Sequence, residues 1–172
     1  LSTKATDWQW SVSSETSSTK TITAELKTTT PAHGFTFSYP KEDLEFQALR
    51  NQYNIGKPNV SIILTSPNST SPSNTTLSID VDTTDCQTAV ADQFGFHSVA
   101  TESELIGGEK FDHATSFYNN VGGADDSGEA YLGKINDTCY FFFILSDRTV
   151  PLATYNENIA EMQRILQTIK FF

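Results

Sequence analysis

The strongest constraint in this sequence is one uninterrupted apolar run, Tyr140–Leu145, which reads YFFFIL. A helix that crosses a membrane needs about 18 apolar residues, so a run of this length suits a buried strand instead. A turn at Asn136-Asp137 connects it to a strand over 129–135, which follows another over 109–118. We therefore expect an antiparallel meander with the apolar strand at its centre.

Alternating apolar and polar residues predict the other strands. They are expected over 34–40, 60–64, 77–81 and 104–106. In the first, Phe35, Phe37 and Tyr39 share one face and Pro40 ends the run. The second and third read as an antiparallel pair around a loop rich in Ser, Pro and Asn. Gly107-Gly108 predicts a tight turn before the strand that begins at residue 109.

Two capping boxes, Thr84–Gln87 and Thr154–Glu157, predict the starts of two helices. The first helix carries Cys86 on its apolar face. The second has an apolar stripe suited to packing on a sheet, formed by Ile159, Met162, Ile165, Leu166 and Ile169. Lys170–Phe172 then forms a last strand or a plug against the core, and residues 41–53 fit either a helix or a loop.

The predicted order is strands, a helix, more strands and a final helix, without an alternating strand–helix–strand repeat. That order favours the α+β class, with a mostly antiparallel β-sheet flanked by helices in an α/β/α sandwich. A chain of 172 residues fits one domain with a sizeable core. We place this domain at residues 31–172 and expect the Ser/Thr-rich residues 1–30 to be a tether or an extra hairpin.

The charge balance excludes two classes of partner. The chain has 11 Lys and Arg against 21 Asp and Glu, a formal net charge of −10. Phosphate backbones and anionic lipid surfaces would repel such a domain, so we expect neither nucleic acid nor direct membrane binding. Protein, glycan and cation partners remain open.

The two cysteines, Cys86 and Cys139, lack the spacing of a redox motif and are too few for a metal knuckle. We expect them to form a disulfide in an exported protein, and two buried thiols in a reducing compartment are the alternative. The chain starts at Leu1 without Met, which suggests that a leader or anchor has been removed. An extracytoplasmic location follows, either secreted, periplasmic or attached to the envelope.

Four landmarks occur together: GFTFSYP at 34–40, Gly107-Gly108 before a strand, a strand pair within 133–145, and ILQTIKF at 165–171. In combination they resemble the PsbP-like family, above all its exported bacterial members, over residues 34–172. Ile169 stands where those members usually have an aromatic residue. The resemblance implies a PsbP-like sandwich that serves as a platform for other macromolecules. Relatives include a photosystem II extrinsic subunit, a nuclear factor acting on the Ran GTPase, and envelope lipoproteins, but a shared fold does not fix function.

Two acidic groups are candidate cation sites, because hard cations prefer several carboxylate oxygens. Asp80, Asp82 and Asp85 form D-x-D-x-x-D, without the Gly and closing Glu of an EF-hand loop. Asp125, Asp126 and Glu129 crowd a second loop around Ser127-Gly128. The structural alternatives are a solvent-facing strand with a helix N-terminus for the first group and a solvated turn for the second.

Motifs for catalysis or nucleotide binding are missing from the sequence, which contains neither a G-x-S-x-G elbow nor a P-loop nor a G-x-G-x-x-G, so we expect no cofactor. Glu102, Glu104 and Glu109 leave open a hydrolase with paired carboxylates in a cleft. His113 alternates with Phe111 and reads as a hydrogen-bonded histidine at the edge of the core rather than as a metal ligand or base.

Trp8 and Trp10 share one strand face, either as a binding patch or as cover for a sheet edge. The sequence as a whole favours a non-enzymatic extracytoplasmic module that binds or helps to assemble another protein of the cell envelope. One alternative is a protein that binds a cation or small ligand with its acidic loops. Another is a hydrolase whose site is not visible in the sequence.

Overall fold

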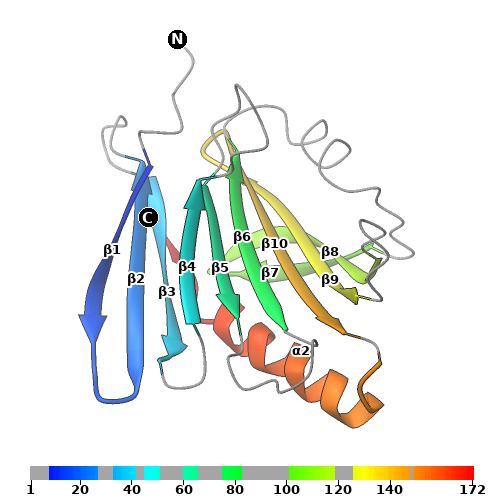
Figure 1. Ribbon diagram of the computed structural model, residues 1–172. Coiled ribbons are helices and arrows are strands. Elements are labelled where there is room, and N and C mark those ends of the chain that lie inside the picture. Colours follow the sequence, from blue (N-terminus) through cyan, green and yellow to red (C-terminus); the bar gives the residue numbers. More distant parts are fainter. Residues whose placement is uncertain are drawn as a thin grey trace.

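The computed structural model describes residues 8–26, 33–41, 45–50, 60–65, 75–82, 101–118, 126–147 and 149–172. These residues form two antiparallel sheets and a helix (Figure 1). Sheet A has the order β1-β2-β3-β11, with bounds Trp8–Glu15, Thr19–Leu26, His33–Pro40 and Lys170–Phe171. Sheet B has the order β4-β5-β6-β10-β9-β8-β7. Its bounds from β4 to β10 are Glu45–Arg50, Val60–Thr65, Thr76–Asp82, Thr101–Ile106, Glu109–Tyr118, Asp126–Ile135 and Thr138–Asp147. The helix, α2, spans Leu152–Leu166.

The predicted α+β class, an α/β/α sandwich with helices flanking one sheet, is wrong, because the described residues form two antiparallel sheets and one helix and are closer to an all-β protein. Residues 8–26 form the β1–β2 hairpin, and β2 pairs with β3. Residues 45–50 form β4, which pairs with β5. Residues 8–26 are largely polar, and residues 45–50 contain apolar and polar residues in equal number, so the strand state of both segments depends on neighbouring strands that local sequence does not report. The other predicted helix, over 84–94, lies outside the described residues.

β10 carries the apolar run and is the middle strand of sheet B, where it pairs antiparallel with β6 and β9. The predicted meander forms as β8-β9-β10, but its central strand is β9 and not the apolar strand. Its side chains alternate between two faces that are both buried. Tyr140, Phe142 and Ile144 lie on the inner face, toward α2 and sheet A, and Cys139, Phe141 and Phe143 lie on the outer face. Burial on both faces explains why this strand is apolar at every position from 139 to 145.

The predicted turn at Gly107-Gly108 is confirmed: the two glycines have φ angles of 60° and 85° and connect β7 to β8. Asn136 and Asp137 make the corresponding turn between β9 and β10, with φ angles of 50° and 61°. Positive φ at both central residues is the geometry of a two-residue hairpin, and Gly, Asn and Asp tolerate it. These turns fix the register of the four strands from β7 to β10.

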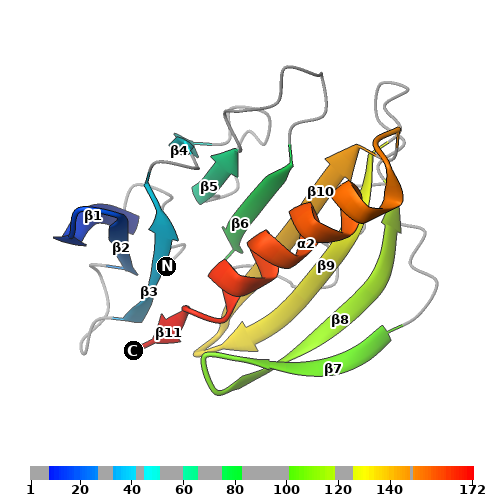
Figure 2. The ribbon, with the colours of Figure 1, turned by 90° about the horizontal axis from the view of Figure 1, so that it is seen from below.

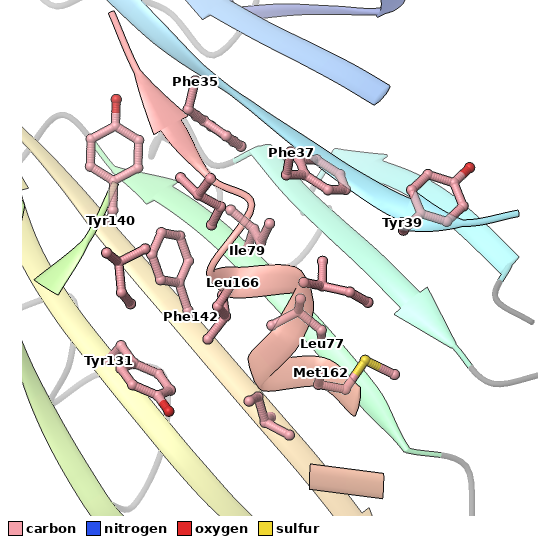
Figure 3. Close-up of a cluster of buried hydrophobic side chains, with 14 of the residues drawn as sticks. Phe35, Phe37, Tyr39, Leu77, Ile79, Tyr131, Tyr140, Phe142, Met162 and Leu166 are labelled. Carbon is pink, nitrogen blue, oxygen red and sulfur yellow. The ribbon is translucent and has the colours of Figure 1, made fainter. Parts of the chain in front are cut away.

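The main core lies between sheet A, the inner face of sheet B and α2. Figure 3 shows Phe35, Phe37 and Tyr39 on β3 facing this space, as the sequence predicted, with Met162 and Leu166 entering it from α2. Phe142 from β10 stacks on Phe111 from β8, with ring centroids 5.0 Å apart. The sheets and the helix therefore share one apolar interior.

α2 lies across the inner face of sheet B over β10 and also contacts β3 (Figure 2). It begins at Leu152 after Pro151, and no side chain caps it, so the predicted capping box at Thr154–Glu157 does not mark its start. After it, Lys170–Phe171 forms β11 against β3, which confirms the predicted last strand. Among the described residues, no helix combines the length and the apolar character needed to cross a bilayer.

Candidate functional site

Six polar side chains meet on the inner face of sheet B beside α2, and we name them the His113 cluster. Its members are Glu104 on β7, His113 on β8, Glu129 and Tyr131 on β9, and Gln163 and Gln167 on α2. The strand register produces this grouping: His113 lies opposite Tyr131, and Glu104 lies opposite Phe111, two positions away on the same face.

His113 is at the centre of the cluster and is only 8% exposed. Its Nδ1 lies 3.0 Å from Oε2 of Glu104, and its Nε2 lies 3.0 Å from Oε2 of Glu129. Ionised carboxylates only accept hydrogen bonds, so both contacts form together when the imidazole carries two protons or one carboxyl group keeps its proton. In either state both ring nitrogens are engaged inside the protein, as expected for a hydrogen-bonded histidine at the core edge.

Glu129 is the shared acceptor of the cluster. Besides its contact with His113, its Oε2 accepts hydrogen bonds from the Tyr131 hydroxyl at 2.7 Å and from Nε2 of Gln163 at 2.6 Å. The Tyr131 ring stacks on His113, with centroids 4.2 Å apart and planes 14° apart. Burial raises the pKa of Tyr131 well above its usual range, and the hydrogen bond to Glu129 acts in the same direction. The phenol therefore stays neutral and remains a donor.

The second carboxylate is tied to the helix in the same way. Glu104 accepts a hydrogen bond from Nε2 of Gln167 at 3.1 Å, and its side chain is 35% exposed. Gln163 and Gln167 are one helical turn apart, so both amides reach the sheet from the same side of α2. Glu104 and Glu129 each contact His113 and also accept a hydrogen bond from a glutamine at α2. Each carboxylate therefore links its own strand to His113 and to the helix.

Carboxylates, an imidazole and a phenol are groups that enzymes use for acid–base chemistry. Here each of these groups bonds to another member of the cluster. Within the ranges that the structure describes, no three His, Cys, Asp or Glu side chains are placed to hold a metal ion. We interpret the His113 cluster as the polar half of the contact between α2 and sheet B.

The predicted acidic groups are not brought together where the structure describes them. Asp80 and Asp82 belong to β6, and Asp126 begins β9, whereas Asp85 and Asp125 lie outside the described residues. Asp82 pairs with Cys139 at one end of β10, and Asp126 pairs with Asp147 at the other end. At about 3.3 Å per residue, these two pairings are separated by about 26 Å along β10.

Cys139 is fully buried on the outer face of sheet B and is not a free thiol. Its predicted partner, Cys86, lies outside the described residues. The disulfide between them therefore stays a prediction.

A pocket of about 390 Å³ lies between α2 and strands β2 and β3. Its polar lining consists of Thr19, Ser38, Tyr39, Glu161, Arg164 and Thr168. The Thr168 hydroxyl already accepts a hydrogen bond from the Ser38 amide at 2.9 Å, and the Ser38 hydroxyl bonds to Thr21 at 2.8 Å. These hydrogen bonds hold the end of α2 against β3. Because the polar groups already serve this purpose, we assign the pocket no ligand.

The clearest exposed apolar feature is on β1, and we call Trp10 and Val12 the β1 edge patch. Trp10 is 48% exposed and Val12 is 47% exposed. They lie opposite Ala24 and Ile22 on β2, which are buried. Side chains directly opposite in an antiparallel pair point to the same face, so the patch continues the core-facing side of sheet A beyond the core. Trp8, the other predicted patch residue, pairs with Leu26 in the same ladder.

Sequence reasoning named Glu104, His113 and Glu129 separately, Glu129 as part of an acidic loop, but did not bring them together and did not find Gln163 or Gln167. The sequence does contain a signal, since Glu129 and Tyr131 alternate along one strand and the two glutamines are four residues apart. That signal requires the register of three strands and the position of a helix, and neither is local.

The comparisons with known proteins add no relative: no protein-family model matches this chain, and no curated protein or solved structure shows significant similarity to it. The resemblance to the PsbP-like family therefore stays a prediction.

Proposed function

We propose that this protein is a non-enzymatic extracytoplasmic module that binds and helps to assemble other proteins, and that the β1 edge patch is its binding surface. The observation that carries the proposal is the abrupt change in burial across sheet A. Phe35 on β3, Ala24 on β2 and Trp10 on β1 are neighbours across sheet A. Phe35 and Ala24 are buried, whereas Trp10 is half exposed. An aromatic side chain of this kind is a common anchor in protein interfaces.

The position of the patch favours a protein partner. β1 is the terminal strand of sheet A (Figure 1). An extended segment of a partner can add to such an edge through backbone hydrogen bonds, with alternate side chains giving specificity. The residues from Gln9 to Ser14 carry no charge, so they offer nothing specific to a cation or an anion.

The His113 cluster supports the non-enzymatic reading. Its imidazole and carboxylates contact one another and α2, and they account for the most deeply placed titratable groups on β7, β8 and β9. These contacts hold α2 against sheet B. The predicted Cys86–Cys139 disulfide favours an extracytoplasmic location, secreted or attached to the envelope, with an envelope protein as partner.

Site-specific photo-cross-linking in cells of the source organism tests the proposal. A photoreactive amino acid at Val12 is expected to capture one defined protein, and the same amino acid at Leu105 is the matched control. Leu105 is also an exposed apolar residue on an edge strand, 64% exposed on β7. Equal capture from both positions, or none from Val12, would contradict the proposed surface.

A further inference from the structure

The described sheets end in four strands, β1, β11, β4 and β7, and of these β1 and β7 differ in charge. β1 ends sheet A, and β7 ends sheet B. β7 carries Glu102 and Glu104, both with solvent exposure, whereas β1 is uncharged until its last residue, Glu15. Glu15 is itself paired with Lys41, whose ammonium lies 2.9 Å from its carboxylate and lowers the pKa of Glu15. The β1 edge is therefore a neutral surface on a strongly acidic chain.

We propose that the occupant of the β1 edge is a second copy of this chain, paired antiparallel with β1 so that two four-stranded sheets A become one continuous sheet. This inference rests on the proposed function, because it uses the same surface and names the partner. Such a contact is isologous, since the same strand of each copy lies on both sides of a two-fold axis.

The irregularity in β1 fixes the register of this pairing. The ladder between β1 and β2 shifts between Val12 and Ser14, so the regular part of β1 covers residues 8–12. An antiparallel pairing of this part with itself is centred on Trp10. It places Trp10 opposite Trp10 of the second copy and Val12 opposite residue 8. The exposed apolar positions of each copy then lie beside those of the other, and cross-strand aromatic pairs of this kind are stabilising.

Charge allows a second copy at this edge and disfavours one at β7. Two chains with a net charge of −10 repel one another, so they can meet only where neither presents acidic groups. The β1 edge meets this condition and the β7 edge does not, because charged side chains on an edge strand prevent pairing with a copy. A basic partner would be drawn to Glu102 and Glu104 on β7 rather than to β1.

The size of the contact predicts its strength. It consists of a five-residue ladder and the exposed halves of two side chains from each copy, well below the roughly 1,200 Å² of total area that a stable interface buries. We therefore expect a weak dimer, with a Kd on the order of 0.1 to 1 mM in dilute solution. Attachment of the protein to a surface would raise its local concentration and favour the paired state.

Sedimentation equilibrium of the whole chain tests the proposal, together with tryptophan emission over the same concentrations. The chain has two tryptophans, at positions 8 and 10 of β1, so its tryptophan emission reports on this strand alone. From about 10 μM to about 1 mM, the average mass is expected to rise toward that of a dimer while the emission shifts to the blue. Val12→Lys should abolish both changes, and Leu105→Lys, which adds the same charge to β7, should preserve both.

Three outcomes would overturn the proposal. The first is a mass that stays monomeric up to about 1 mM. The second is a dimer that persists in Val12→Lys, and the third is a dimer lost equally in Leu105→Lys. If the chain stays monomeric while Val12 still cross-links to a different protein, the second copy is excluded and the binding surface stands. If Val12 gives no cross-link to any chain, the surface itself is wrong.

Discussion

Beside α2, each of six polar side chains bonds to at least one other of the six, whereas at the β1 edge two apolar side chains keep about half of their surface in water. The two regions lie at opposite ends of the inner layer of the molecule (Figures 1 and 2). In the first, neighbours satisfy every group of the His113 cluster. In the second, the chain maintains a strand whose apolar face is only partly covered. A side chain beside α2 is thus expected to affect folding, and a side chain at the β1 edge is expected to affect binding.

The largest effect on stability is expected from Phe142→Ala in the apolar part of the α2 contact. Phe142 is fully buried and stacks on Phe111, so its truncation leaves a cavity among side chains from both sheets. The free energy of unfolding should fall by about 3 to 5 kcal/mol in denaturant titrations. Phe142→Leu, which keeps most of the volume, should cost much less. A loss below about 1 kcal/mol for Phe142→Ala would show that neighbouring side chains rearrange to fill the cavity.

Glu129→Ala tests the polar part of the same contact. It removes the acceptor shared by His113, Tyr131 and Gln163, so we expect a loss of about 2 to 4 kcal/mol in the free energy of unfolding. The matched control is Glu157→Ala on α2, which breaks an exposed pair with Arg164 at 3.2 Å. That change should cost less than about 0.5 kcal/mol. Similar losses for the two variants would contradict a structural role for the cluster.

Alkaline pH should weaken the same region. Burial raises the pKa of both Tyr131 and Tyr140 above the ordinary value of 10.0. A raised folded pKa means that the stabilisation is complete below pH 10 and is lost as pH rises above it, because the unfolded phenols ionise first. A phenolate absorbance titration should show Tyr131 and Tyr140 within a late group that ionises only together with unfolding. Tyr131→Phe should reduce that late group by one, and an early titration of both would contradict their burial.

Trp10→Ser should have the smallest effect on stability. Trp10 is 48% exposed and lies on the terminal strand, so the free energy of unfolding is expected to change by less than about 0.5 kcal/mol. Cross-linking from Val12 should nevertheless be lost in this variant. A large loss of stability would mean that the β1 edge belongs to the core, and the contrast between the two regions would disappear.

The sequence predicted the parts of the fold that depend on local patterns. The position of β10 follows from its apolar run, and the two hairpins from β7 to β10 follow from Gly107-Gly108 and Asn136-Asp137, which prefer a positive φ. The fold class was missed because the strands β1 and β2 contain mostly polar residues and β4 is half polar. Such segments become strands only when a neighbouring strand supplies their hydrogen bonds, and that neighbour is distant in the sequence.

The candidate sites show the same difference between features that depend on local sequence and features that depend on distant residues. The sequence allowed Trp10 to be either part of an exposed binding patch or cover for a sheet edge. Only the structure shows that β1 extends beyond the core and that Trp10 is partly exposed. The His113 cluster could not be assembled from the sequence, because Glu104, Glu129 and Gln163 come from three separate elements. Their meeting depends on the register of sheet B and on where α2 crosses it.

Because β3 pairs with β11, β3 is synthesised well before the strand that it pairs with. Ser38 on β3 bonds to Thr168, which lies 130 positions later in the chain. At synthesis rates of about 5 to 20 residues per second, β3 waits roughly 6 to 26 s for this partner. During that interval Phe35 and Phe37 have no complete layer to cover them. The layer that covers Phe35 and Phe37 is therefore completed only after the last elements of the chain have emerged.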